Sequence, residues 1–251
     1  MDLDLTGRGV LFDKDGTLFD FTASWAAASA RILHELADGD DARLARMAQA
    51  GGFDLQEHRF LPSSVIIAGT AGELYDVFAE AGGLPHAHVR SVIDTTVAEA
   101  EMVKVAGIDA ALAALRAAGA RLGVVTNDSA EAAVLHLRAS GLEAYFDTIV
   151  GYDSGYMPKP APGSCLGAAA ELDLAPSACV MVGDSTHDLE AGAAAGMVPL
   201  AVLTGIAQTH TLAPLANAVL PSAAEVPHWF SQSDPYGAPS GKTTTNVAFD
   251  T

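Results

Sequence analysis

The chain has 251 residues, of which 50% are hydrophobic and 18% charged, so it can form one large domain, or one domain with a smaller insertion, around a sizeable core. Its 13 basic and 31 acidic residues give a net charge of -18, which argues against nucleic acid and anionic membranes as partners because both require clustered Lys and Arg. The acidic N-terminus is unlike a signal peptide, no apolar run could span a bilayer, and the 2 cysteines lack metal-binding spacing, so we expect a cytoplasmic protein.

The first predicted element is a short buried strand that begins at Val10 and runs into a tight loop. In Val10-Leu-Phe-Asp-Lys-Asp-Gly-Thr-Leu18, the carboxylates Asp13 and Asp15 and then Gly16 follow the apolar run. Chemistry in open α/β sheets collects at the carboxyl ends of strands. Two close carboxylates repel unless a cation lies between them, and Mg2+ is a natural complement. The segment therefore suggests an aspartate that attacks an anionic group with the help of a metal.

The next stretch, residues 20–104, is too long for a single crossover between strands and has a helical periodicity of its own. Ala26–Leu36 and Gly72–Ala81 carry that periodicity. We interpret residues 20–104 as an inserted helical cap domain, with residues 1–19 and 105–230 forming the core domain. Residues 231–251 contain many turn formers and are expected to be a flexible tail.

Beyond the insertion, helical stretches alternate with apolar runs. Ile108–Gly119 has helical spacing and stops at a glycine. The runs that predict buried parallel strands are Arg121–Asn127, Asp147–Gly151, Ala178–Asp184 and Val198–Gly205. Strands that alternate with helices indicate an α/β fold, a Rossmann-like doubly wound parallel sheet core that carries the inserted α-helical cap.

Two segments in the middle of the chain carry groups suited to an anionic site. Thr126 and Asn127 end one strand just before a helical stretch, where a hydroxyl and backbone N–H groups can cradle a phosphate. The same residues, with Asp128 and Ser129, can instead simply cap the helix. Lys159 lies among prolines, which hold the chain extended and can fix one cation in place, although a single lysine is usually a solvated surface group.

The fourth predicted strand ends in an acidic segment, Gly183-Asp184-Ser185-Thr186-His187-Asp188. Asp184 and Asp188 are four positions apart and can share a face if the helix begins early. One could bind a metal directly while the other orients it or holds a bound water. Alternatively, both only stabilise a helix N-terminus through the macrodipole. His187 is left out of the site, because a lone histidine there is more often exposed.

Taken in order, these four segments resemble the motifs of the haloacid dehalogenase-like phosphohydrolases. The family has a DxDGT loop, a Thr or Ser that ends the next strand, a Lys, and a GDxxxD-type acidic segment. The resemblance covers Val10 to Gly205, and the layout is most similar to phosphoglycolate phosphatase-type members with a helical cap. It implies that Asp13 is the nucleophile that becomes an aspartyl-phosphate, and that Asp15 is the general acid and then the general base.

The resemblance also implies a phosphate-binding set and a cofactor. The transferring phosphoryl group would be held by Thr126, Asn127 and Lys159, and the cofactor would be Mg2+. Its ligands would be Asp13, the backbone carbonyl of Asp15, and Asp184, with Asp188 in support. Lys14 occupies a variable position that is often apolar in the family; it either forms a salt bridge away from the site or adds positive charge near it.

The leading interpretation is a Mg2+-dependent phosphatase, a monomer or homodimer, that hydrolyses a small phosphorylated metabolite selected by the cap. Within the cap, Arg59 could bind a substrate carboxylate, and Trp25 is a second candidate for substrate contact. One alternative is a phosphomutase of the same fold, which keeps both aspartates. A 2-haloacid dehalogenase would lack the second aspartate, Asp15, and a non-catalytic binding module would be expected to have lost part of the site. The sequence identifies neither the substrate nor the oligomeric state.

Overall fold

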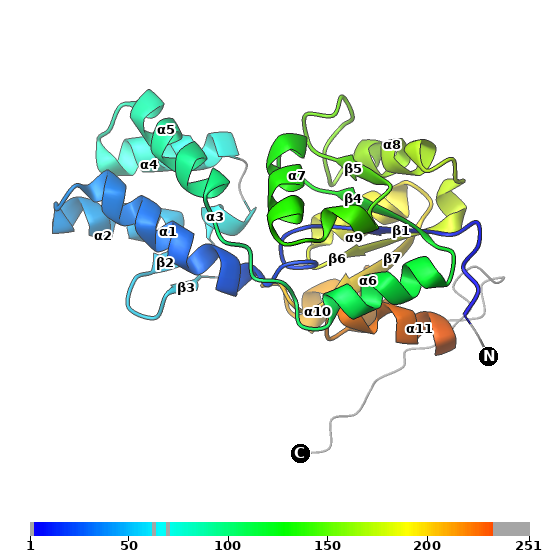
Figure 1. Ribbon diagram of the computed structural model, residues 1–251. Coiled ribbons are helices and arrows are strands. Elements are labelled where there is room, and N and C mark those ends of the chain that lie inside the picture. The colour runs from blue at the N-terminus through cyan, green and yellow to red at the C-terminus, as the bar shows by residue number, and fades with distance from the viewer. Residues whose placement is uncertain (1–2, 62–63, 69–70, 233–251) are drawn as a thin grey trace, which may run out of the picture. The chain divides into compact units, whose positions relative to one another are not determined.

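The computed structural model describes residues 3–61, 64–68 and 71–232, which form two compact units (Figure 1). Phe21–Val103 is the helical unit. The sheet unit combines the described residues up to Asp20 with those from Lys104 onward. Apart from residues 231 and 232, the predicted tail lies outside the described residues.

The sheet unit is built on a 6-stranded parallel sheet with the order β5-β4-β1-β6-β7-β8. Its strands are β1 (Gly9–Phe12), β4 (Arg121–Val125), β5 (Thr148–Val150), β6 (Cys179–Gly183), β7 (Val198–Val202) and β8 (Ala218–Leu220). In the middle, Phe12 of β1 is paired with Val124 on one side and with Val182 on the other. Strands β1 and β6 are buried along their whole length, as parallel strands covered on both faces must be.

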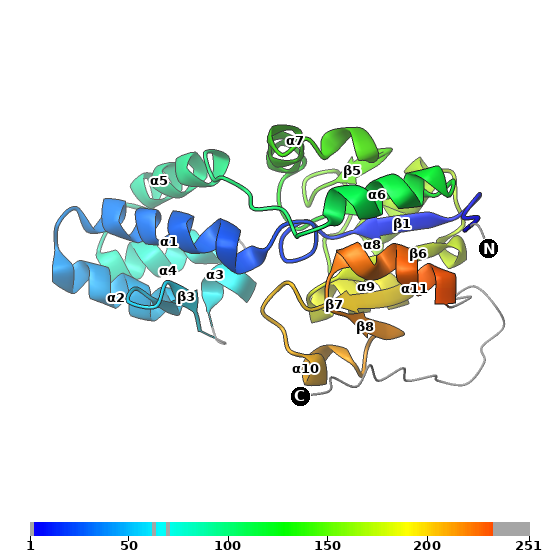
Figure 2. The same cartoon turned by 60° about the horizontal axis from the view of Figure 1, so that its bottom comes forward.

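Helices connect these strands and cover the sheet. They are α6 (Ile108–Ala117), α7 (Ala130–Ala139), α8 (Gly163–Glu171), α9 (Thr186–Ala194), α10 (Thr209–Leu212) and α11 (Val226–Gln232), with short 3-10 turns η1 (Glu143–Tyr145), η2 (Pro176–Ala178) and η3 (Ala223–Glu225). The chain runs outward from β1 through β4 to β5, returns to β6 and runs outward again. Because crossovers are right-handed, this reversal places α6 and α7 on one face and α8 and α9 on the other (Figures 1 and 2).

The direction of the chain reverses between β1 and β6, which are neighbours in the sheet. At such a switch point the loops after the two strands diverge and leave a crevice at their carboxyl ends, where ligands of open α/β sheets bind. Asp13 and Asp184 follow these two strands directly. The predicted doubly wound α/β fold is therefore confirmed, and it brings the first and last motifs together.

Strand β8 was not among the predicted strands. It has only 3 residues, all half-buried, and it lies at the edge of the sheet beyond β7. A short edge strand lacks the long apolar run by which the central strands are recognised.

The helical unit contains α1 (Phe21–Ala37), α2 (Asp41–Gly51), α3 (Val65–Ala68), α4 (Ala71–Gly82), α5 (His86–Ala98) and a small hairpin of β2 (Phe53–Asp54) and β3 (Arg59–Phe60). Helix α1 packs on α2 and α5, and α4 packs on the same two helices. Phe60 of the hairpin makes an edge-to-face contact with Phe21 of α1, whose ring centroid lies 5.2 Å away, and another within the hairpin with Phe53, at 5.1 Å. Within the described ranges, no helix combines the length and the apolarity needed to cross a membrane.

The two leucines of α7 provide a test of this packing. Leu137 is fully buried, whereas Leu135 on the same helix is 45% exposed. We expect Leu137→Ala to lower the free energy of unfolding by about 2–5 kcal/mol, because it removes buried methyl groups and leaves a cavity. The matched control Leu135→Ala should change it by no more than about 0.5 kcal/mol. Urea unfolding followed by circular dichroism measures both, and equal losses would contradict the assigned buried face.

Candidate active site

The candidate site lies where the chain leaves β1 at the carboxyl edge of the sheet. The backbone N–H of Asp13 donates to the carbonyl of Val182 at 2.9 Å, which continues the pairing with β6 beyond the strand. The chain then turns sharply, with the N–H of Gly16 donating to the carbonyl of Phe19 at 2.8 Å. Gly16 has a φ of 80°, which L side chains rarely adopt. The turn therefore needs the glycine of the first motif.

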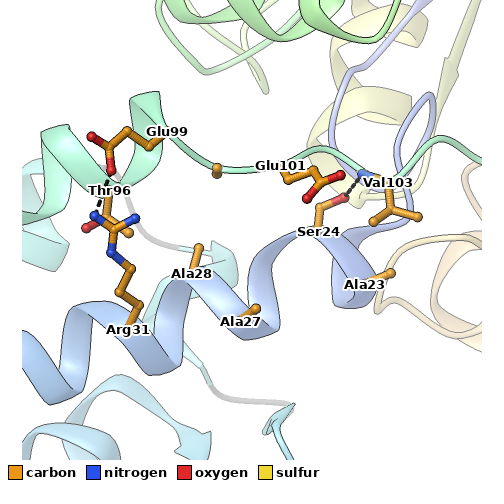
Figure 3. Close-up of a pocket in the computed structure, with 10 residues that line it drawn as sticks. Ala23, Ser24, Ala27, Ala28, Arg31, Thr96, Glu99, Glu101 and Val103 are labelled. Atoms are coloured by element: carbon orange, nitrogen blue, oxygen red, sulfur yellow. Dashed lines mark hydrogen bonds and ion pairs between the residues drawn. The ribbon is translucent and has the colours of Figure 1, made fainter.

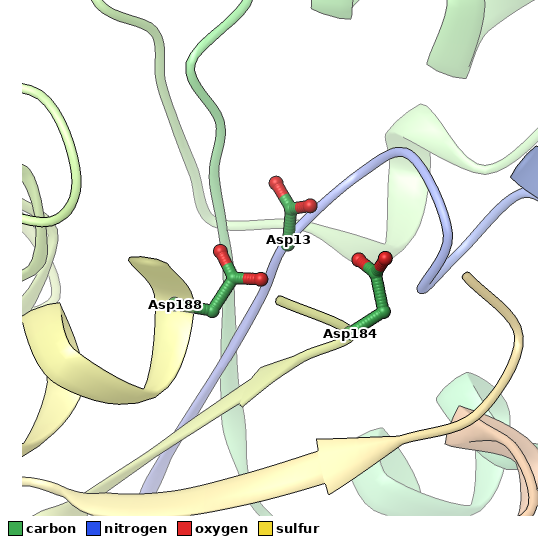
Figure 4. A group of neighbouring side chains, drawn as sticks. All are labelled: Asp13, Asp184 and Asp188. Carbon is green, nitrogen blue, oxygen red and sulfur yellow. The ribbon is translucent and has the colours of Figure 1, made fainter. Parts of the chain in front are cut away.

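Three carboxylates from separate segments meet at this edge (Figure 4). Asp13 follows β1, Asp184 follows β6, and Asp188 lies in the first turn of α9. Each contributes an oxygen, and the three oxygens lie within 4.8 Å of one another. Asp184 and Asp188 are only 8% and 1% exposed. The cluster is the kind of oxygen-only arrangement that can hold a hard metal ion.

Lys159 is the cation of this cluster. Its Nζ donates to Asp13 Oδ1 at 2.7 Å, to Asp188 Oδ1 at 2.6 Å and to the carbonyl of Val125 at 2.8 Å, so all three of its protons are engaged. Burial alone would lower the pKa of Lys159, but the two carboxylates outweigh it and hold the pKa above its usual value. The ammonium group therefore remains charged.

One ammonium does not balance the negative charge of this site. Burial raises the pKa of Asp13 to about 7; Lys159 opposes the rise, and the nearby charge of Asp188 adds to it. Burial also raises the pKa of Asp184, and the charges of Asp188 and Asp13 raise it further. A divalent cation with oxygen ligands would relieve this imbalance, so Mg2+ fits the donor set of Asp13, Asp184 and Asp188.

Glycines and threonines surround Asp184, and the sequence analysis did not identify them as site residues. The hydroxyl of Thr17 donates to Asp184 Oδ1 at 3.4 Å. A Cβ atom would lie 2.4 Å from Asp184 Oδ2 at Gly16 and 1.7 Å from it at Gly205, so neither position can carry a side chain without displacing the carboxylate. Thr204 donates to the carbonyl of Gly16 at 2.6 Å. Thr204 could have been found from the sequence, because it is a polar residue near the end of the last predicted strand, Val198–Gly205.

Asp188 takes one of the two roles that the sequence left as alternatives, that of a helix cap, while a role toward a metal stays a prediction. Its Oδ2 accepts hydrogen bonds from the N–H and the hydroxyl of Ser185, at 3.0 and 2.7 Å, in a capping box at the start of α9. Its Oδ1 accepts from Lys159. Helix capping thus orients the carboxylate toward the cluster. His187, left out of the predicted site, is exposed.

Asn127 and Thr126 lie after β4, beside the segment that carries Lys159. The side-chain amide of Asn127 donates to the carbonyl of Lys159 at 2.8 Å and accepts from its N–H at 3.0 Å. Thr126 is 2% exposed, and its hydroxyl accepts from the N–H of Asp128 at 3.1 Å. Asn127 therefore holds the lysine segment in place, while phosphate binding by these residues stays a prediction.

The Asp15 carboxylate does not join the acidic cluster. Its Oδ2 lies 2.8 Å from Nζ of Lys14, whereas Asp13 is paired with Lys159. The turn thus gives each of the two carboxylates its own lysine, and a metal ion between Asp13 and Asp15 stays a prediction. Lys14 forms salt bridges with Asp15 and Asp128, so it combines a salt bridge with a positive charge beside the predicted acid, where the sequence had left the two as alternatives. The metal contact through the backbone carbonyl of Asp15 stays a prediction.

The helical unit contains the two predicted substrate contacts. Trp25 lies half-buried on α1, and Arg59 lies on β3 with its Nη2 3.6 Å from Asp54 Oδ2. A cavity in this unit is lined by Ala23, Ser24, Ala27, Ala28, Arg31, Thr96, Glu99, Ala100, Glu101 and Val103 (Figure 3). An ion pair between Arg31 and Glu99 at 2.6 Å spans it. Neither Trp25 nor Arg59 lines this cavity, and their contact with a substrate stays a prediction.

Comparisons with known proteins identify the family of the chain. The sequence profile of the haloacid dehalogenase-like hydrolases matches residues 8–196. Phosphoglycolate phosphatase from Nitrosospira multiformis is 30% identical over 232 residues, which cover 87% of this chain and 93% of that protein. Pyrophosphatase PpaX from Bacillus velezensis is 38% identical over 98 residues, but the match spans only 39% of this chain and 45% of PpaX.

Solved structures show a similar arrangement of the chain. CbbY from Rhodobacter sphaeroides in complex with xylulose-1,5-bisphosphate has a TM-score of 0.63 at 26% identity, covering 87% of this chain and 95% of CbbY. The β-phosphoglucomutase from Clostridium difficile also has a TM-score of 0.63, at 19% identity, covering 91% of this chain and 96% of that protein. At that identity the second match supports the fold alone.

The raised pKa of Asp13 makes the stability of the metal-free protein depend on pH. Folding raises this pKa from 3.8 to about 7, so the associated stability is present below 3.8 and lost as pH rises through about 7. We expect the thermal unfolding midpoint, relative to that of Asp13→Asn, to fall across this interval. Added Mg2+ should raise the wild-type midpoint more above pH 7 than at acidic pH, because metal and protons compete for the carboxylates.

Circular dichroism melts of both proteins at constant ionic strength measure this dependence. Parallel pH profiles of the wild type and Asp13→Asn would contradict the raised pKa of Asp13. An equal effect of Mg2+ at both ends of the interval would contradict the competition.

Proposed function

Because the chain belongs to the haloacid dehalogenase-like hydrolases, we propose that it is a Mg2+-dependent phosphatase that hydrolyses a small phosphorylated metabolite through an aspartyl-phosphate. The observation that carries this proposal is the position of Asp13. Its carboxylate accepts from the buried Lys159 and lies beside the carboxylates of Asp184 and Asp188, at the switch point of the sheet. A nucleophile, a fixed cation and an oxygen-only metal site are the components that phosphoryl transfer requires.

The first half of the reaction moves the phosphoryl group from substrate to enzyme. A carboxylate oxygen of Asp13 attacks phosphorus and forms an O–P bond, while the bond from phosphorus to the ester oxygen breaks. The carboxyl group of Asp15 gives its proton to that leaving oxygen, so the alcohol departs neutral and Asp15 is left as a carboxylate.

The second half returns the enzyme to its starting state. Asp15 takes a proton from water, and the water oxygen attacks phosphorus as the bond to Asp13 breaks. Inorganic phosphate leaves, Asp13 is again a carboxylate and Asp15 again carries its proton. Lys159 contacts Asp13 throughout and offsets charge on the attacking oxygen and the phosphoryl group. When bound by Asp13, Asp184 and Asp188, Mg2+ supplies further neutralisation of that charge.

The relatives that span most of the chain support a proposal for the substrate class. Those from Nitrosospira multiformis and Xylella fastidiosa are phosphoglycolate phosphatases, each 30% identical and covered to 93% of its length. We therefore place a small monoester that also carries a carboxylate first among the candidate substrates. The helical unit would select it, with Arg59 and Trp25 as the proposed contacts. The enzyme would act in the cytoplasm on a free metabolite.

A phosphomutase would use the same Asp13 and Asp15 and differ only in the acceptor of the phosphoryl group. CbbY, whose structure contains a sugar bisphosphate, and β-phosphoglucomutase share the fold. Phosphoglycolate phosphatases that match 87% and 75% of this chain favour water as the acceptor. Stimulation of activity by a sugar bisphosphate would instead favour the mutase.

Phosphate release from p-nitrophenyl phosphate and a panel of small esters, including 2-phosphoglycolate, tests the proposal. We expect release that requires Mg2+ and stops with EDTA. Asp13→Asn should lower kcat/KM by at least about 10³-fold, because it removes the nucleophile. Asp173→Asn is the matched control, since Asp173 is exposed and its φ of 54° suits asparagine; it should keep wild-type activity. A folded, Mg2+-loaded wild type that releases phosphate from none of the esters would refute the phosphatase function.

A further inference from the structure

Lys14 is the residue of the first motif that the proposed reaction does not use, yet its side chain is fully buried. Its Nζ lies 2.8 Å from Asp15 Oδ2, 3.3 Å from Asp128 Oδ2 and 3.1 Å from His136 Nδ1. An ammonium group is removed from water only at high cost unless its charge and its protons are matched. Burial alone would lower the pKa of Lys14, but Asp15 and Asp128 outweigh it and raise the pKa above its ordinary value.

The three contacts account for all three protons of the ammonium group. Because an ammonium group can only donate, Nδ1 of His136 must accept and therefore carries no proton in this arrangement. His136 lies on α7 and is 3% exposed. Lys14 is thus held by groups of the protein itself, one of which is the carboxylate of Asp15.

Asp128 is itself held firmly where β4 passes into α7. Its Oδ1 accepts from the N–H of Ser129 at 2.9 Å, and its own N–H donates to the hydroxyl of Thr126 at 3.1 Å. Its carbonyl accepts from the N–H of Tyr152 at 2.9 Å. Lys14 therefore links the carboxylate of Asp15 to a rigid part of the neighbouring strand end.

We propose that Lys14 is a positioning residue, which is anchored by Asp128 and His136 and holds the carboxyl group of Asp15 at the place from which it protonates the leaving oxygen. This inference rests on the proposed phosphatase reaction. Asp15 lies in a loop and its side chain is 21% exposed, so without an anchor it would sample several orientations. Proton transfer requires the acid to be within hydrogen-bond reach of the leaving oxygen, and small displacements are costly.

The leaving group distinguishes this role from a purely structural one. An alkyl phosphate needs a proton on its departing oxygen, whereas p-nitrophenolate is stable enough to leave without one. We expect Lys14→Met to lower kcat/KM by about 100-fold for the alkyl ester that the wild type hydrolyses fastest. For p-nitrophenyl phosphate the loss should be less than about threefold, because attack by Asp13 is intact.

Two further variants complete the experiment. Asp128→Asn removes the charge that anchors Lys14 but preserves the shape of the side chain. It should also lower kcat/KM selectively for the alkyl ester, by a smaller factor of about tenfold. If Lys14→Met does not fold, the Asp128→Asn variant alone tests whether Lys14 positions Asp15. Arg138→Met is the matched control, because Arg138 also lies on α7 and forms an exposed ion pair with Glu143. It should leave both esters unaffected.

Equal losses on the two esters, or no loss on either, in a folded Lys14→Met or Asp128→Asn variant would overturn the positioning role. Failure of the proposed function gives a different result, since the wild type itself would then release phosphate from no ester. An active wild type combined with variants that lack the selective loss refutes only the role of Lys14.

Discussion

The candidate site depends on one buried ammonium group, that of Lys159, which joins three segments far apart in the chain. It donates to Asp13 after β1, to Asp188 in α9 and to the carbonyl that ends β4. In a buried setting such charge-assisted contacts are screened little by water. Removing the lysine would leave two carboxylates without compensation, and that is far more costly than losing a surface ion pair. The arrangement of the cluster is therefore set by charge as much as by packing.

A second buried lysine, Lys14, separates the environments of the two aspartates in the first motif. Asp13 turns toward Lys159 and the acidic cluster, while Asp15 turns toward Lys14 and the start of α7. The two aspartates are only two positions apart, but the sharp turn at Gly16 gives them different neighbours. Each carboxylate then has an environment of its own. This is the condition under which one can serve as a nucleophile and the other as an acid and base.

The topology of the sheet brings the three carboxylates of the site together in this acidic protein. The reversal of the chain between β1 and β6 opens a crevice at the carboxyl edge, and Asp13 and Asp184 follow these two strands. The capping box of α9 turns Asp188 toward the same point. Thr17 and the glycines at 16 and 205 leave just enough room for Asp184. Although the chain has a net charge of -18, the negative charge of these carboxylates is partly offset by Lys159 and, in the proposed function, by a metal ion.

The sequence by itself determined the fold class and the edge at which the motifs meet, because hydrophobic periodicity and turn residues are local signals. From them follow the central strands and the positions of Asp13, Thr126 and Asp184 at strand ends. The partner of each charge was decided only by the tertiary structure. Lys14 and His136 are separated by 122 positions, and no local pattern reports that a lysine beside two aspartates is fully buried against a helix. The space around Asp184 and the pairing of the edge strand β8 also depend on contacts between segments that are distant in the chain, and these contacts exist only once the sheet has formed.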